Sequence, residues 1–414
     1  MNKGLLNKNF FLLWQGQLVS QLGDQAFIIA MNFWIKHETG SASLVGMIMM
    51  LSTLPSVILG PFAGTFADWH SRKKIIVISD LLNGLAVISM GIAIYYNAME
   101  TKYLLIMLFI ISTFVAIINS FFRPAITASI PELVSKDKLE AANSMNESTL
   151  QLASFIGQGG GGLLYKMFGP ALLFIGDGIT YLFSSFSESF INIPQKIERK
   201  KHDSIKELIN HFISDMKGGF QYIYKRKGMR NLFLIAAVLN FFLMPIIVLL
   251  PFFVEDFLKK GADWYGYIMG AFGAGALLGY FLVSIIKMSP KIRSLSIVFL
   301  IVINSSIVAL LGLVRNPIIA LLMMFIAGIM NGFININIMT AIQVSTDNNI
   351  RGRVFGLLQT MSMGITPISM GLSGVVADLL NQNIPLVYIV SGGIATILSF
   401  LVGLNKNTRE FLAF

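Results

Sequence analysis

The stretch that decides the fold runs from residue 43 to residue 97 and reads SLVGMIMMLSTLPSVILGPFAGTFADWHSRKKIIVISDLLNGLAVISMGIAIYYN. It holds two apolar runs, 43–67 and 74–97, joined by a short turn that carries Asp68, Arg72 and Lys73. About 20 apolar residues are enough for a helix to cross a hydrocarbon core about 30 Å thick. In lipid each backbone amide needs a partner within the structure, which favours helices. The stretch therefore predicts a hairpin of two membrane-spanning helices.

Similar apolar runs continue on both sides of this hairpin. We predict twelve spans, at 10–35, 43–67, 74–97, 102–121, 144–167, 170–192, 230–254, 264–287, 293–314, 317–340, 353–379 and 384–404. Of the 414 residues, 55% are hydrophobic and 13% are charged, whereas soluble domains average about 25% charged residues. The composition therefore excludes a soluble protein and predicts an all-α membrane protein with twelve transmembrane helices.

The distribution of Lys and Arg predicts the orientation of the chain in the membrane. With twelve spans both termini lie on one side, and the segments on that side carry 25 of the 31 Lys and Arg residues. Positively charged loops stay on the cytoplasmic side, so both termini are expected to be cytoplasmic. The net charge of +10 is explained by these loops, and we expect no nucleic-acid partner.

The widest gap between predicted spans lies at 193–229 and divides the chain into six spans plus six. We therefore predict an N-terminal six-helix bundle at 1–192, a cytoplasmic linker at 193–229 and a C-terminal six-helix bundle at 230–414. Apolar residues in the linker, from Ile205 to Ile223, recur at the spacing of an amphipathic helix. This helix either lies on the membrane surface or packs as a linker on the two bundles.

The turn after the second span contains Gly64, Asp68, Arg72 and Lys73. This spacing resembles the signature loop of the major facilitator superfamily, Gly-x-x-x-Asp-x-x-Gly-Arg-[Arg/Lys], with Ser71 in place of the second Gly. The resemblance implies a close-packed helix end at Gly64 and a cytoplasmic gate. In that gate Asp68 would meet the start of the eleventh span or its Arg351 and Arg353. A basic loop that only fixes the topology is the alternative.

Further segments resemble the macrolide efflux branch of that superfamily. They are Arg123-Pro124-Ala125, Ile130-Pro131-Glu132-Leu133-Val134, Ala142-Asn143-Ser144 and Arg351-Gly352-Arg353-Val354. The resemblance implies the major facilitator fold and a secondary transporter, not an enzyme, that exports small amphipathic drugs by proton antiport and alternating access. It also implies a monomer in a bacterial inner membrane, with a small-molecule substrate, protons and the lipid bilayer as partners.

The fifth span contains Gly157, Gln158, Gly161 and Gly162. A dinucleotide site is excluded for two reasons: no strand precedes these glycines, and they lie inside an apolar span. They resemble the antiporter motif Gly-Pro-x-x-Gly-Gly of exporters, although Gln158 replaces the proline. The alternative is close helix packing through small residues. A second run of glycines, from Gly266 to Gly279, is interpreted as packing only.

Acidic residues inside spans are the candidates for function, because a charge in lipid is costly. In the first span, Gln17, Gln21 and Asp24 share one helix face, and in the fifth span Glu147 and Gln151 lie on another. We predict that these two faces bind protons or substrate, with structural hydrogen bonds between helices as the alternative. A third polar face, in the sixth span, holds Asp177, Tyr181, Ser184 and Glu188 and is ranked lower. Asp80 is interpreted as a structural partner of Arg72 or Lys73.

The C-terminal half has no acidic residue in the middle of a span. Its polar groups there are amides and hydroxyls, of which Asn240, Asn335 and Gln359 are predicted to contact substrate. This asymmetry suggests that the N-terminal half handles protons and that both halves contact the transported molecule.

The remaining features bear on other functions. The chain has no Cys, its four His residues lie near span ends or in loops, and no Gly-x-x-x-x-Gly-Lys-[Ser/Thr] motif occurs. We therefore predict no metal site, no cofactor and no ATP hydrolysis. Two alternatives to a drug exporter stay open, an uptake symporter or lipid transporter of the same fold and a membrane receptor without transport.

Overall fold

The computed structural model describes residues 4–195, 217–218, 220–286, 288–347 and 350–413. Throughout this part of the chain the regular structure is helical and contains no strand. Its residues group into two compact units, one within Met1–Gly40 and Leu51–Asp203 and the other within Ser41–Met50 and Ser204–Phe414. The predicted all-α fold is confirmed.

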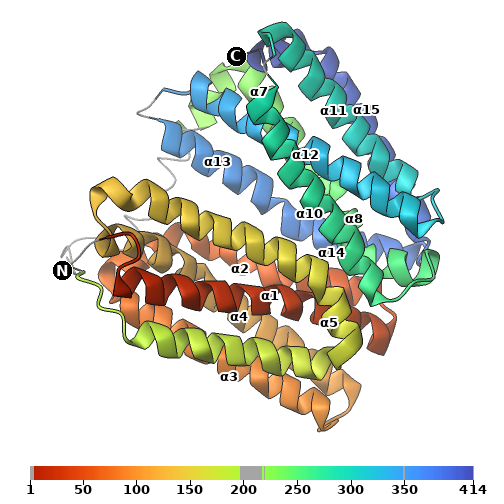
Figure 1. The fold of residues 1–414 in the computed structure, drawn as a ribbon. Helices are drawn as coiled ribbons and strands as arrows, with labels where there is room; N and C mark the ends of the chain where they lie inside the picture. Colours follow the sequence, from red (N-terminus) through yellow and green to blue (C-terminus); the bar gives the residue numbers. More distant parts are fainter. Residues whose placement is uncertain (1–3, 196–216, 219, 287, 348–349, 414) are drawn as a thin grey trace. The chain divides into compact units, whose positions relative to one another are not determined.

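The first unit is built from long helices that run side by side (Figure 1). They are α1 (Lys8–Thr39), most of α2 (Ala42–Trp69), α3 (Arg72–Tyr95), α4 (Thr101–Leu133) and α5 (Leu139–Ser189), with a 3₁₀ turn, η1 (Lys136–Lys138), before α5. The side chain of Asn7 caps α1 by accepting from the backbone N–H groups of Asn9 and Phe10. Gly40 ends the helix in a left-handed conformation with φ 64°.

Helix α5 contains two of the predicted spans. It breaks at Gly169, whose φ of 71° and ψ of 173° are not helical, and Pro170 follows directly. Glycine adopts this conformation without a steric penalty, and proline is well suited to begin the next helix. The chain therefore turns between a first arm, residues 139–168, and a second arm, residues 170–189, where the sequence predicted the end of one span and the start of the next.

Helix α4 is longer than predicted. The predicted fourth span ended at residue 121, but α4 continues through Pro124 and Pro131 to Leu133. Each of these prolines removes one backbone donor from the helix. Two hydroxyl groups in this part of α4 bond to backbone carbonyls one turn earlier, Thr127 to Arg123 and Ser129 to Ala125. As a consequence Arg123 lies within the helix, ten residues before its last residue.

The first residues of α2 group with the second unit through Asp378. One carboxylate oxygen of Asp378 accepts from the Ser41 hydroxyl at 2.8 Å and from the backbone N–H of Ser43 at 2.8 Å. The other accepts from the backbone N–H of Ala42 at 3.1 Å. The carboxylate thus satisfies free donors at the N-terminus of α2, where a negative charge is favoured.

The second unit consists of shorter helical pieces followed by long helices. These are α7 (Lys227–Leu243), α8 (Pro245–Val248), α9 (Leu250–Phe252), a π-helical turn η2 (Phe253–Phe257), α10 (Ala262–Ile285), α11 (Pro290–Leu311), α12 (Pro317–Ser345), α13 (Arg351–Gly364), α14 (Thr366–Leu379), α15 (Ile384–Leu404) and α16 (Lys406–Phe411). Helices α10 and α12 touch backbone to backbone at glycines. A Cβ atom on Gly275 would lie 2.1 Å from the Phe325 carbonyl oxygen, and one on Gly328 would lie 2.0 Å from that of Phe272.

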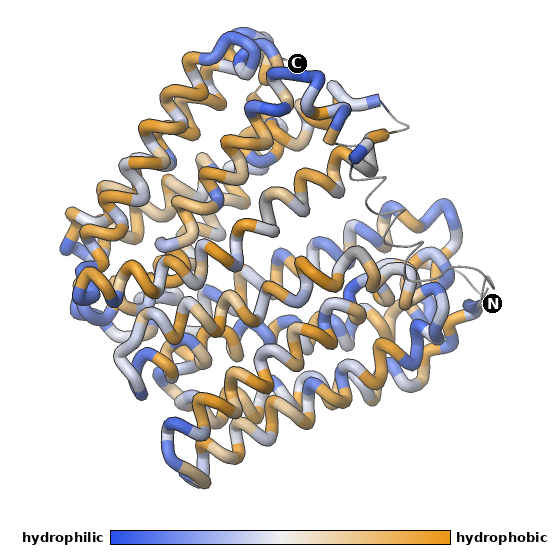
Figure 2. The backbone as a smooth tube through the Cα atoms, turned by 180° about the vertical axis from the view of Figure 1, so that it is seen from behind, coloured by the Kyte–Doolittle hydropathy of each residue, from blue (hydrophilic) through white to orange (hydrophobic). Residues whose placement is uncertain are grey.

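The number of membrane crossings follows from these helices. Nine helical stretches of the described residues are long and apolar enough to span a membrane. In Figure 2 the helices are largely hydrophobic, and hydrophilic residues gather toward their ends. The stretch at 136–189 turns at Gly169 and supplies two crossings. Helix α1 and the pair α13 and α14, which are separated only by Ile365, occupy the first and eleventh predicted spans. The described helices thus match the twelve predicted spans.

The predicted linker at 193–229 falls largely on residues 196–216, which lie outside the described residues. Its amphipathic helix and the three-part division of the chain remain predictions.

Candidate functional site

The turn between α2 and α3 is held in place within the first unit. Ser71 caps α3, with its hydroxyl accepting from the backbone N–H of Lys74 at 3.4 Å. Because its φ is −64°, this position does not need the glycine that the signature loop usually has. The side-chain amide of Gln195 bonds the carbonyls of Ala67 and His70, and its oxygen accepts from the backbone N–H of Arg72.

Arg72 pairs with Asp68 inside this turn. Its guanidinium donates to Asp68 at 2.7 Å and to the carbonyl of Ala128 in α4 at 2.8 Å. The close packing expected at Gly64 is not present, because no heavy atom lies within 4 Å of the place of its Cβ. The side chains of Arg351 and Arg353 lie outside the described residues, so the predicted contact of Asp68 with them remains a prediction, as does any gating role of Lys73.

The Arg72 contacts predict a measurable effect on stability. The Arg72 side chain is only 13% exposed, whereas that of Asp68 is 63% exposed. An exposed ion pair contributes little, but the bond from the charged donor to the carbonyl of the partly buried Ala128 contributes more. We expect Arg72→Ala to lower the stability of the first unit by about 1–2 kcal/mol and Lys74→Ala, at an exposed neighbouring position, to leave it unchanged. Thermal unfolding of the purified variants measures both, and equal midpoints would contradict the prediction.

The predicted antiporter-like motif lies where the first arm of α5 packs on α1. A Cβ atom on Gly157 would lie 2.3 Å from that of Gln25, and one on Gly161 would lie 2.4 Å from the Ile29 side chain. Gln158 donates to Gln25 at 3.3 Å and to Ser154 at 2.9 Å. Gly162 is buried beside them. These residues pack the two helices together, and an antiporter role is not required to explain them.

The polar face of α1 meets the second arm of α5 rather than the first. Gln17 is buried and donates to Glu188 Oε1 at 2.9 Å, and Gln21 donates to Gln17 at 3.5 Å. One helical turn further along α1, the hydroxyl of Tyr181 donates to Asp24 Oδ1. In α1 the order is Gln17 then Asp24, and in α5 it is Tyr181 then Glu188. The two antiparallel helices therefore share a ladder of polar contacts.

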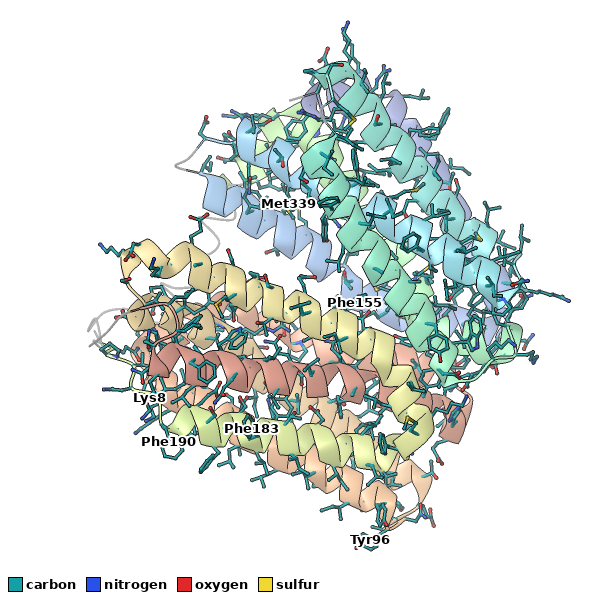
Figure 3. The ribbon with its side chains drawn as sticks, viewed as in Figure 1. Lys8, Tyr96, Phe155, Phe183, Phe190 and Met339 are labelled. Atoms are coloured by element: carbon teal, nitrogen blue, oxygen red, sulfur yellow. The ribbon has the colours of Figure 1, made fainter. Side chains whose placement is uncertain are left out.

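Two glycines of α1 make this ladder possible. A Cβ atom on Gly16 would lie 2.9 Å from the Ser184 hydroxyl, and one on Gly23 would lie 2.4 Å from Asp177 Oδ1. The polar face of α5 thus presses on bare backbone of α1. The opposite face of the second arm carries the exposed Phe183, and the exposed Phe190 follows the last residue of the arm (Figure 3).

The second arm of α5 also packs on α3, in addition to its contact with α1. The two backbones approach at Gly84 and Gly178, where a Cβ atom on either would lie within 3 Å of the other residue's carbonyl oxygen. One turn before Gly84, Asp80 is 0% exposed, and its polar neighbours are Ser184 and Glu188 of α5. The interpretation of Asp80 as a structural partner of Arg72 or Lys73 was wrong. Arg72 bonds instead to Asp68 and Ala128, and neither oxygen of Asp80 has a hydrogen-bond partner among the described residues.

Four carboxyl groups therefore gather in the first unit. Asp24 is partly exposed, whereas Asp80, Asp177 and Glu188 are 0%, 2% and 0% exposed. The Arg123 guanidinium of α4 is exposed and attracts Asp24 electrostatically. Among the described residues, no group of three or more His, Asp or Glu side chains has the geometry to hold a metal ion. Such an arrangement can bind and release protons.

The other predicted site residues lie apart from this cluster. Glu147 and Gln151 are exposed on the first arm of α5. In the second unit, Asn240 donates to the carbonyl of Ala236 and Asn335 donates to Asn331, so each bonds within its own helix. The side chain of Gln359 lies outside the described residues.

From the spacing alone, Asp177 and Glu188 were ranked below Asp24 and Glu147, and Asp80 was assigned to the basic turn, whereas the structure buries Asp80, Asp177 and Glu188 where α3 and α5 meet. The signal that could have found them is a set of glycines close to polar residues in the sequence. Gly16 and Gly23 adjoin Gln17 and Asp24, Gly84 follows Asp80 by one turn, and Gly178 adjoins Asp177. Small residues beside membrane-embedded acids indicate close helix contacts that desolvate those acids.

Comparison with known proteins identifies the family. The model of the transmembrane secretion effector family, which belongs to the major facilitator superfamily, matches residues 3–413. Macrolide efflux protein A of Streptococcus pyogenes is 27% identical over 384 residues, covering 90% of each chain. Multidrug efflux pump Tap of Mycolicibacterium fortuitum is 23% identical and covers 87% of each chain.

A solved structure shows the same fold. The bacterial homologue of the iron transporter ferroportin superimposes with a TM-score of 0.71 at 15% identity, covering 97% of this chain and all of that one. The match over nearly the whole chain and the helical architecture agree. The chain belongs to the transmembrane secretion effector family and is a multi-pass membrane transporter of the major facilitator fold.

Proposed function

We propose that this transporter exports small amphipathic molecules, macrolide-like in character, in exchange for protons. Two of the similar proteins are named for macrolide and multidrug efflux, which supports the direction and the class of substrate. Abundant Phe and Met, 33 and 22 residues, suit a large apolar ligand. Two six-helix bundles would expose the binding site alternately to the two sides of the membrane.

The observation that carries proton coupling is the environment of Asp24. Asp24 is partly exposed as a residue, and its Oδ1 accepts from the hydroxyl of the buried Tyr181. The positive charge of Arg123 acts on it from α4. Protonation would change both interactions and so change the relative stability of the two transport states. The excess of Lys and Arg on one side supports cytoplasmic termini in a bacterial inner membrane.

The proposed function is tested in two steps. In a bacterial host that lacks its own drug pumps, production of this chain is expected to raise resistance to macrolides several-fold. Purified protein in liposomes with an imposed proton gradient is then expected to move the same drug against the proton flow. Drug movement in the same direction as the protons would show uptake, and no flux or binding across a broad panel of compounds would contradict transport altogether.

A further inference from the structure

Three carboxyl groups of the first unit are sealed from solvent and have oxygens without donors. Asp80, Asp177 and Glu188 are at most 2% exposed. Neither oxygen of Asp80, nor Asp177 Oδ2, nor Glu188 Oε2 has a hydrogen-bond donor at bonding geometry among the described residues. An ionised carboxylate in an apolar interior is costly unless it is paired or fully hydrogen-bonded. These groups therefore need a partner that the side chains around them do not provide.

Among the described residues, no basic side chain bonds to the unpaired oxygens of these acids. On α3 the basic residues are Arg72, Lys73 and Lys74 in the first turn, six or more residues before Asp80, and Arg72 bonds Asp68 and Ala128. On α4 the charge of Arg123 acts on Asp24. The groups that face the buried acids are otherwise acidic or neutral: Gln17 and Asp24 from α1, and Asp177, Tyr181 and Ser184 from α5.

The contacts of Asp80 with α5 show what the missing ligand is. Asp80 has Ser184 and Glu188 as its polar neighbours. Gln17 donates to Glu188 Oε1, which leaves Oε2 without a donor among the described residues. The Ser184 hydroxyl has one hydrogen and can serve only one acceptor. Two ionised carboxylates at this place would repel each other, whereas one proton between them turns two acceptors into a donor and an acceptor.

We propose that Asp80 and Glu188 form a second proton-binding site in which the two carboxyl groups share one proton. The pair then carries a single negative charge, and the protonated acid donates to the other. The close approach of α3 and α5 at Gly84 and Gly178, and of α1 and α5 at Gly16, excludes water from the pair. The ligand of this site is the proton itself.

The role of this site in transport rests on the proposed function. Asp24 and Asp80 interact electrostatically, and Tyr181 and Glu188, which bond to the two ends of the ladder, lie seven residues or about 10 Å apart along α5. A change in the charge of one site is therefore felt at the other. The shared proton would keep the Asp80–Glu188 pair at one negative charge while Asp24 gains and releases its own proton.

The site can be tested by infrared spectroscopy of the purified protein, since protonated and ionised carboxyl groups absorb at different frequencies. The wild type is expected to show a protonated-carboxyl band at neutral pH that Asp80→Asn removes and that Glu188→Gln also removes. Because the proton is shared, the double variant is expected to remove no more than either single variant. Glu410→Gln, at an exposed position paired with Lys406, is expected to leave the band unchanged.

Two results would overturn the proposal. One is the absence of any protonated-carboxyl band in the wild type, which needs no variant to fold. The other is an additive loss, in which each substitution removes a band of its own. The liposome assay separates this proposal from the proposed function: if export ignores the proton gradient while the shared band is present, the coupling fails and the proton site stands.

Discussion

Asp24→Asn is expected to abolish export driven by a proton gradient while the protein still folds and binds substrate. Asparagine keeps the shape of the side chain, and its oxygen can still accept from the Tyr181 hydroxyl that now bonds Asp24 Oδ1. What is lost is the group that gains and releases a proton. Moving one proton charge through 100 mV supplies about 2.3 kcal/mol, which corresponds to about a fifty-fold bias. The variant should therefore no longer build up a drug concentration ratio of about fifty-fold across the membrane.

The measurement is the initial rate of drug transport in liposomes, with and without an imposed pH gradient. Exchange of labelled for unlabelled drug without a gradient shows that the variant is folded and able to bind. Asp137→Asn is the matched control, because Asp137 is an acid on the exposed turn η1 outside the polar ladder. Gradient-driven export at the wild-type rate by Asp24→Asn would remove this carboxyl group from the mechanism.

The fold could be predicted from the sequence because membrane helices depend on local properties. The length of an apolar run decides whether it can span the bilayer, and the Gly169-Pro170 turn between the arms of α5 is encoded in two adjacent residues. The end of α4 lies beyond the predicted end of the fourth span at residue 121. Pro124 suggests a helix end, and only the structure shows a helix that continues to Leu133.

The candidate site could be predicted only in part, because it depends on which helix faces meet. The spacing of Gln17, Gln21 and Asp24 indicated one polar face, and the spacing of residues 177, 181, 184 and 188 indicated another. Nothing in a spacing says that these two faces lie against each other, as the contacts Gln17–Glu188 and Tyr181–Asp24 show. The place of Asp80 behind them depends on the approach of α3 to α5 at Gly84 and Gly178, which is a tertiary contact.

Gly392 and Gly393 are adjacent in α15 but have different surroundings. Gly392 lies against α11, where an added Cβ would be 2.3 Å from the backbone nitrogen of Ala309, whereas nothing lies within 4 Å of a Cβ on Gly393. The same two helices are joined by hydroxyl pairs, Ser305 with Ser399 and Ser306 with Thr396, each at 3.3 Å. A methyl group at 392 must push the helices apart and lengthen these bonds.

We therefore expect opposite signs for two substitutions one residue apart. Gly392→Ala should destabilise the second unit by about 2 kcal/mol, since overpacking exceeds the gain in helix propensity. Gly393→Ala should stabilise it by up to about 1 kcal/mol, because alanine is the better helix former and meets open space. The midpoints of thermal unfolding of the two purified variants measure this difference directly. Since the variants share a helix and a substitution, equal midpoints would mean that α11 and α15 do not pack through Gly392.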